Sequence, residues 1–166
     1  NAPFAVDASS GLVSVTADGM HFTDQTAVTG ASVSLWGGAV NLILRNDSLT
    51  SGVGHGLVIQ RSAAGSTVNV TDSTLAAGRN ALLIGANSNV TIDGGTVGPS
   101  GYDAILVQQS AAVNQVALSL NDTVVSGSAT NGIDIFGYTD LTLSNTTISH
   151  NKRNGVLLNS SMATGS

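Results

Sequence analysis

The chain contains few side chains that could carry out acid–base chemistry. It has ten Asp, no Glu, three His and five Lys plus Arg, and its only basic cluster is residues 150–153. Removing a proton beside a sugar carboxylate needs a base, an acid and a cation that neutralises the carboxylate. Asp103, His150 and Arg153 could supply these groups if the fold brought them to one corner. The plainer interpretation, which we favour, is a solvated basic loop and an Asp that serves a turn.

Metal and covalent chemistry have less support still. Cys is absent, so the chain offers no thiolate ligand, no thiol nucleophile and no disulfide. No two His residues lie at ligand spacing, and the segment Asp93-Gly94-Gly95 is one isolated turn rather than the tandem Gly- and Asp-rich nonapeptide that binds calcium. We therefore predict no metal site and no cofactor.

A repeat defines the elements that would position any site. A pattern of apolar-x-apolar, four further residues and a third apolar residue occurs six times, at intervals of 22 to 29 residues. A second apolar-x-apolar pair follows each copy. Units of this length cannot bury their own apolar faces, so they stack on one another. The six copies are Val13/Val15/Met20, Leu42/Leu44/Leu49, Val68/Val70/Leu75, Val90/Ile92/Val97, Leu118/Leu120/Val125 and Leu141/Leu143/Ile148.

One interval shows how the chain folds. Within residues 81–103, two alternating segments centred on Leu83 and Thr91 and a short one at Val97 are separated by turn residues. Like segments lie a full interval apart, which favours parallel pairing between intervals over hairpins. The sequence therefore predicts an all-β, right-handed parallel β-helix of about six to seven coils, with three short strands in each coil.

Domain organisation and charge narrow the functional classes. We expect one β-helix domain over residues 1–166, a fragment of a longer solenoid because neither end shows a cap, with a flexible tail at 159–166.

Only 9% of residues are charged and the net charge is −5. A nucleic-acid partner would need a stripe of Lys and Arg, so we exclude it. No run of 18 apolar residues occurs, so we expect no membrane span in this segment.

The outward positions of the first strands contain an unexpected row. Outward positions on a solvated strand are normally polar, yet this row contains Val58, Leu83, Leu106 and Leu157, interrupted only by Asp134. A covering loop or another part of the chain would explain these residues. Alternatively, they form an exposed apolar stripe that binds a partner or a second copy of the chain. Both interpretations stay open at this point.

The repeats resemble the right-handed parallel β-helix superfamily, the pectin-lyase-like proteins, over nearly the whole chain. The segment GIDIFGYTDLTLSNTTISHNKRNG at 132–155 is similar to generic members of that group. Within it, the Cys-free, Ala-, Gly-, Ser-, Thr- and Asn-rich composition and phrases such as SNVTIDGGT at 88–96 most resemble the pertactin-like passenger domains of bacterial autotransporters. This resemblance implies an adhesin or virulence factor that is extracellular or on the bacterial surface, anchored in the outer membrane in the full-length protein.

We therefore expect a non-enzymatic scaffold that presents loops to a protein or carbohydrate on a host or matrix surface, with self-association through the solenoid ends or the apolar stripe as a further possibility. Two alternatives have different requirements. A polysaccharide lyase or epimerase, or its inactive remnant, would use the corner of Asp103, His150 and Arg153. A carbohydrate binder of the phage tailspike type would be a stable trimer.

Overall fold

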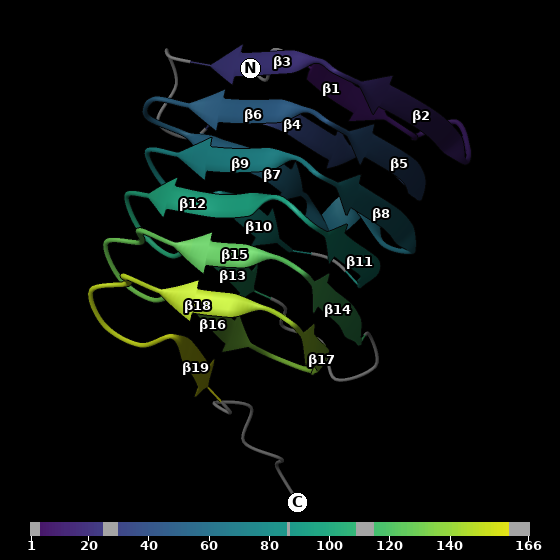
Figure 1. Cartoon of the computed structure of the whole chain (residues 1–166). Coiled ribbons are helices and arrows are strands. Elements are labelled where there is room, and N and C mark those ends of the chain that lie inside the picture. The colour runs from purple at the N-terminus through teal and green to yellow at the C-terminus, as the bar shows by residue number, and fades with distance from the viewer. Residues whose placement is uncertain (1–3, 25–29, 86, 109–114, 160–166) are drawn as a thin grey trace, which may run out of the picture.

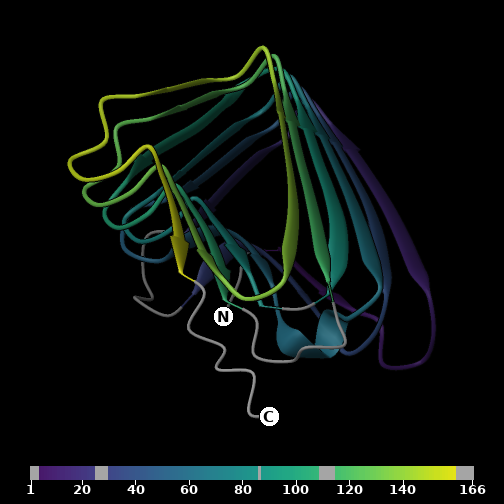
Figure 2. The same ribbon diagram turned by 90° about the horizontal axis from the view of Figure 1, so that it is seen from below.

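The computed structural model describes residues 4–24, 30–85, 87–108 and 115–159, and over these ranges the chain is a solenoid. Three parallel β-sheets form its walls, and the chain passes from one wall to the next in each coil (Figure 1). Seen along the axis, the walls enclose a three-sided core (Figure 2). The winding is right-handed, as the sequence predicts, and there are about six coils. Residues 160–166 of the predicted tail lie outside the described ranges.

Each coil contributes one strand to each sheet. Among the described residues, sheet A contains seven strands and sheets B and C contain six each. Sheet A consists of β1 (Phe4–Asp7), β4 (Ala31–Trp36), β7 (His55–Ile59), β10 (Leu82–Ile84), β13 (Ile105–Gln108), β16 (Ile133–Phe136) and β19 (Val156–Asn159). Sheet B consists of β2 (Val13–Asp18), β5 (Val40–Arg45), β8 (Ser66–Thr71), β11 (Ser88–Asp93), β14 (Val116–Asn121) and β17 (Thr139–Ser144). Sheet C consists of β3 (His21–Asp24), β6 (Ser48–Ser51), β9 (Thr74–Ala77), β12 (Thr96–Ser100), β15 (Val124–Ser126) and β18 (Thr147–Ser149).

The alternation of apolar and polar residues places one face of every strand in the core. In β11 the inward residues Val90 and Ile92 are buried, whereas Thr91 between them is exposed. The strand pairing aligns Ile92 with Leu120 of the next coil, so that inward side chains stack in rows along the axis. Full burial of one such side chain contributes roughly 1.5–3 kcal/mol, and the rows therefore hold neighbouring coils together.

A row of bends separates sheet B from sheet C. The residues at this bend have positive φ angles of 48° to 53° at Asn46, Asp72, Asp122 and Asn145, and 74° at Gly94. Asn and Asp tolerate this left-handed conformation better than other residues with side chains, because their short polar groups can bond the nearby backbone. Residues that tolerate this conformation therefore recur at the same place in successive coils. After each bend, the chain turns into a short strand of sheet C.

The first coil departs from the predicted pattern. The triplet Val13/Val15/Met20 is wrong, because the sheets pair Val15, Ala17 and Phe22 with the triplet of the second coil. Met20 is instead 49% exposed. Ala17 is apolar but small, and it therefore does not stand out in a pattern of large aliphatic residues. The bend here is formed by Gly19, with a φ of 67°, at the same place as the later Asn and Asp residues.

The last coil is less covered than those within the stack. Inward residues that are buried elsewhere become exposed here, with Leu143 at 42% and Leu158 at 67%. At the other end, the rings of Phe4 and Phe22 lie 5.3 Å apart and pack against the core. One turn of 3-10 helix (η1, Arg61–Ala63) follows β7, and within the described part of the chain no helix is long and apolar enough to cross a membrane.

Candidate functional site

The predicted outward row of sheet A is aligned in the structure. Parallel pairing of β7, β10 and β13 places Val58, Leu83 and Leu106 side by side on three consecutive coils. Their side chains are half-buried, as is that of Leu157 on β19. Asp134 of β16 lies between Leu106 and Leu157 in the same row. The outer face of sheet A therefore presents a continuous apolar row across three coils.

Polar residues occupy both ends of that three-coil row. Ser34 of β4 precedes Val58, and its hydroxyl accepts a hydrogen bond of 2.9 Å from the Gln60 side chain. At the other end, Asp134 is buried and accepts bonds from Asn131 at 3.1 Å and from Asn159 at 2.8 Å. Burial raises the pKa of the Asp134 carboxyl, and the nearby charge of Asp103 raises it further. The apolar residues thus lie between two hydrogen-bonded polar groups.

Asp103, one of the three candidate catalytic residues, lies at the corner between sheets C and A. Its Oδ1 atom accepts hydrogen bonds from the Thr130 hydroxyl at 2.5 Å and from the Asn131 backbone N–H and side-chain amide, both at 3.0 Å. The side chain is only 9% exposed. In this arrangement, the carboxylate satisfies polar groups of the following coil. That is the turn role that the sequence favoured for Asp103.

The other two members of the predicted catalytic corner lie on the surface of the last coil. His150 is exposed and has a positive φ of 55°, and its Nδ1 lies 3.0 Å from the Ser149 hydroxyl. The Arg153 side chain is exposed, while its backbone N–H donates to the carbonyl of Thr130. The hydrogen bonds of the described residues do not link the side chains of Asp103, His150 and Arg153 to one another.

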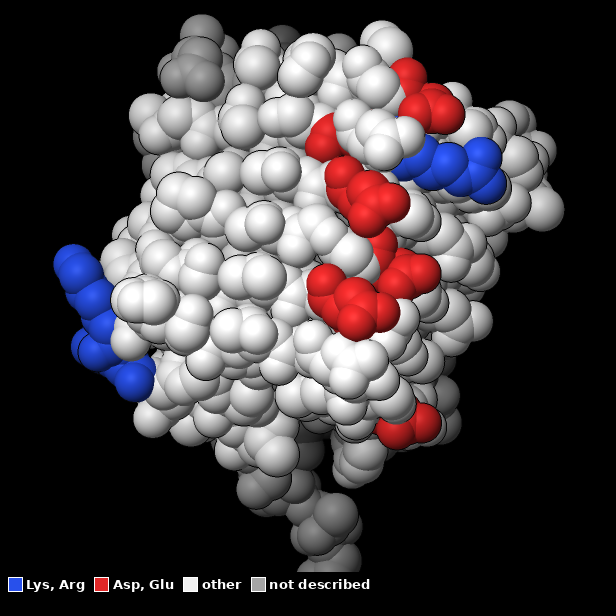
Figure 3. Space-filling model, in the orientation of Figure 1, with Lys and Arg blue, Asp and Glu red and all other residues white. Residues whose placement is uncertain are grey.

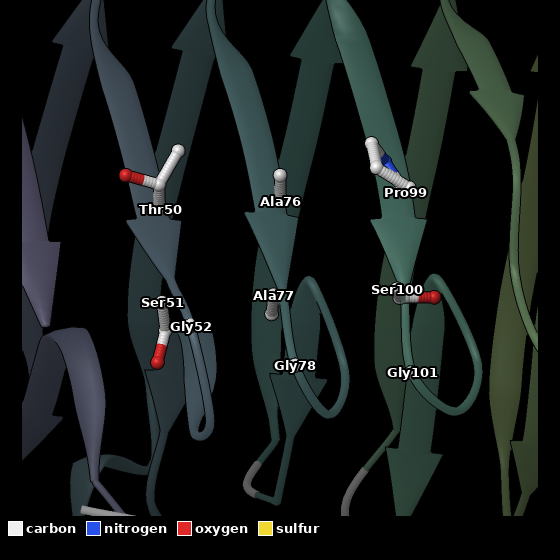
Figure 4. A pocket seen from close by; sticks show the side chains of 9 residues that line it. All are labelled: Thr50, Ser51, Gly52, Ala76, Ala77, Gly78, Pro99, Ser100 and Gly101. Atoms are coloured by element: carbon white, nitrogen blue, oxygen red, sulfur yellow. The ribbon is translucent and has the colours of Figure 1, made fainter. Parts of the chain in front are cut away.

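A shallow groove across sheet C was missed by the sequence reasoning. It crosses the ends of β6, β9 and β12, has a volume of about 410 Å³, and is lined by small residues (Figure 4). The lining residues are Thr50, Ser51, Gly52, Ala76, Ala77, Gly78, Pro99, Ser100 and Gly101. The sequence signal for this groove is the recurrence of Gly at positions 52, 78 and 101. Glycines mark places without side chains, whereas sequence reasoning searches for clusters of functional side chains.

Two larger side chains belong to residues that come directly after glycines of the groove, Arg79 after Gly78 and Tyr102 after Gly101. The guanidinium carbon of Arg79 lies 5.4 Å from the centre of the Tyr102 ring. The backbone N–H of Tyr102 also donates to the carbonyl of Arg79. This cation–π contact, with Tyr102 51% exposed, adds an aromatic surface and a positive charge near the groove.

Acidic side chains gather along the bend between sheets B and C, where a column of red runs down one face (Figure 3). Three of them accept bonds from Asn side chains, Asp18 from Asn46 at 3.0 Å, and Asp93 and Asp122 from Asn121 at 2.7 and 3.0 Å. Within the described ranges, no three His, Cys, Asp or Glu residues are grouped so that they could hold a metal ion. The exposed members of the column are Asp18, Asp72, Asp93 and Asp122.

Comparison with known proteins adds no relative, since no protein family, curated protein or solved structure matches the chain. The parallel solenoid of about six coils is consistent with the β-helix superfamily that the repeats resemble.

Proposed function

We propose that the chain is a non-enzymatic β-helix scaffold that binds a partner through the outer face of sheet A. The observation that carries this proposal is the row of Val58, Leu83 and Leu106 on three adjacent strands. The partner is a protein or carbohydrate on a host or matrix surface. In keeping with the resemblance to autotransporter passengers, the module acts outside the cell or on the bacterial surface, as an adhesin or virulence factor.

The arrangement around the row supports a binding role. Neighbouring strands lie about 4.8 Å apart, so the row forms a narrow, flat strip rather than a pocket. Apolar side chains at the centre are the usual anatomy of a protein interface. Ser34 and Asp134 end the strip and are themselves buried, so the half-buried Val58, Leu83 and Leu106 are its accessible part. A stack of coils paired along its whole length also keeps the strip rigid, which lowers the entropy cost of binding.

The test is Leu83→Asp, which places a charge at the centre of the strip. The purified protein and its variant are compared for binding to cultured epithelial cells and to a glycan array, with circular dichroism as the measure of folding. Thr91→Asp is the matched control, because Thr91 lies in the same coil on the exposed face of sheet B. We expect binding to fall at least tenfold for Leu83→Asp and to be unchanged for Thr91→Asp. Equal binding by all three proteins would contradict the proposal.

Enzymatic and trimeric alternatives are separated by two further measurements. Incubation with pectate and alginate would give unsaturated products that absorb ultraviolet light if the chain were a lyase. Sedimentation would show a stable species of three chains if it were a tailspike-like trimer. The scaffold proposal expects neither result.

A further inference from the structure

A ladder of polar side chains runs along the corner between sheets C and A. It has one residue in each of five consecutive coils, just before or at the start of the sheet A strand, and its members are His55, Asn80, Asp103, Asn131 and Asn154. From Asp103 onwards the ladder is continuous. Asn131 donates its backbone N–H and its amide to Asp103, and Asn154 donates the same two groups to Asn131 at 3.2 and 2.9 Å. Each oxygen therefore binds the residue of the next coil.

The first two rungs do not follow this rule. His55 is 7% exposed and Asn80 is 4% exposed, yet Nδ1 of His55 and Nδ2 of Asn80 have no hydrogen-bond partner among the described residues. Nε of Arg79, the residue before Asn80, is also buried and unpartnered. Polar atoms in this position are costly unless something satisfies them, and native proteins leave few of them unpaired.

The three atoms belong to one corner of two neighbouring coils. The backbone N–H of Gly56 donates to the carbonyl of Asn80, and the N–H of Arg79 donates to the carbonyl of Gly54. His55 thus lies between two residues that pair with Arg79 and Asn80. The charge of Arg79 and the backbone of Asn80 both act on the pKa of its ring.

The chemical state of each atom defines what can bind there. Burial, followed by the charge of Arg79, lowers the pKa of His55 to about 4, so the ring is neutral at pH 7. A neutral imidazole carries a proton on one ring nitrogen and a lone pair on the other, so Nδ1 accepts when the proton is on Nε2 and donates when it is on Nδ1. The corner thus offers two donors, Nε–H of Arg79 and the amide of Asn80, together with Nδ1 of His55, whose role depends on the tautomer.

We propose that a buried water molecule bridges His55, Asn80 and Arg79 and completes the ladder in its first two rungs. With the proton of His55 on Nε2, a water donates one O–H to Nδ1 and accepts from the Asn80 amide and from Nε–H of Arg79, which gives it three partners, the usual number for an internal water. In this tautomer a halide or carboxylate would face the lone pair of Nδ1, and a cation would face the guanidinium in either tautomer. Water both donates and accepts, so it can satisfy all three atoms.

A crystal structure at high resolution tests the site directly. We expect one density peak within hydrogen-bond distance, about 2.7–3.2 Å, of all three nitrogen atoms. A second crystal soaked in sodium bromide separates water from an anion. An anomalous bromide peak at this position would overturn the proposal, as would direct contact between His55 and Asn80 with no density between them.

His55→Asn tests the same site in solution. An Asn at this position can accept directly from Asn80, as Asn131 does from Asn154, and the rung no longer needs a water. We expect the thermal midpoint of His55→Asn to equal or exceed that of the parent, while His55→Ala, which leaves the Asn80 amide without its bridge, unfolds several degrees lower. If His55→Asn lowers the midpoint as much as His55→Ala, the water-bridged rung is the wrong description.

Discussion

Leu→Ala should lower the free energy of unfolding by very different amounts at two positions of the same core row, because the two leucines differ in exposure. Leu120 of β14 and Leu143 of β17 are paired neighbours in sheet B, and both point inward. Leu120 is 1% exposed and has Ile92 on its other side, whereas Leu143 is 42% exposed. Leu→Ala removes three carbons, whose full burial is worth about 2.4 kcal/mol at roughly 0.8 kcal/mol each. The two variants differ in how much of that burial exists.

For Leu120→Ala, the lost burial is joined by the cost of a cavity between Ile92 and Leu143, because both neighbours are held by their own strands. We expect the free energy of unfolding to fall by about 3–4 kcal/mol, within the range for buried Leu→Ala changes. For Leu143→Ala, little more than half of the burial is lost and the site is already open, so the expected cost is about 1.4 kcal/mol.

Urea unfolding followed by circular dichroism and by fluorescence of Trp36 measures both values. Because the coils of a solenoid interact only with their neighbours, the end coil can also open by itself. Hydrogen exchange distinguishes this local opening from global unfolding. Leu143→Ala should raise exchange in β17 and β18 while β8 keeps its protection, whereas Leu120→Ala should raise exchange on both sides of the cavity.

Equal costs for the two variants would refute the reasoning. That result would mean that Leu143 is covered in solution as completely as Leu120. Sedimentation at several protein concentrations would then show whether a second copy provides the cover, because a cost arising from self-association depends on concentration. A cost that is large for Leu143→Ala but independent of concentration would point to a cover from the chain itself.

Three further predictions concern the backbone and pH. Gly78→Ala should cost about 1–3 kcal/mol in urea unfolding, because its Cβ would overlap the carbonyl of Gly52, whereas Gly155→Ala, whose Cβ would have room, should change stability little. The folded pKa of His55, about 4, is below its ordinary value of 6.5, so stability is complete above pH 6.5 and falls as the pH is lowered towards 4; thermal unfolding across that window should lose this slope in His55→Asn. The pKa of Asp134 is raised above 3.8, so its contribution has the opposite sign and stability falls as the pH rises through the folded pKa; Asp134→Asn should remove this slope from acid titrations of the thermal midpoint.

The frame of the fold could be predicted because two independent constraints coincide in each coil. Inward residues two apart define a strand, and a residue that tolerates positive φ must come two positions after the second of them. Leu44 and Asn46 satisfy this rule, as do Leu120 and Asp122. Where one constraint weakened, the prediction slipped by two residues, as it did when Ala17 took the place of a large aliphatic residue in the first coil.

The groove and the ladder could not be predicted in the same way. The groove exists because side chains are small where three coils meet, and its depth depends on the register of Ala76 with Thr50. The polar ladder has one residue in each of five consecutive coils, but the unpartnered atoms of its first two rungs depend on distances between coils, which the spacing of residues along the chain does not contain.

The division between inward and outward rows also explains why sheet A is the best candidate for function. Inward positions must be apolar in every coil, since each row is packed on both sides by its neighbours. Outward positions carry no such requirement, and in sheet B they run through Asn69, Thr91 and Ser119. Leu83 occupies the corresponding outward position of sheet A, where packing within the coil does not demand a large apolar side chain. Its presence in register with Val58 therefore needs another reason, and contact with a partner supplies one that Leu83→Asp can test.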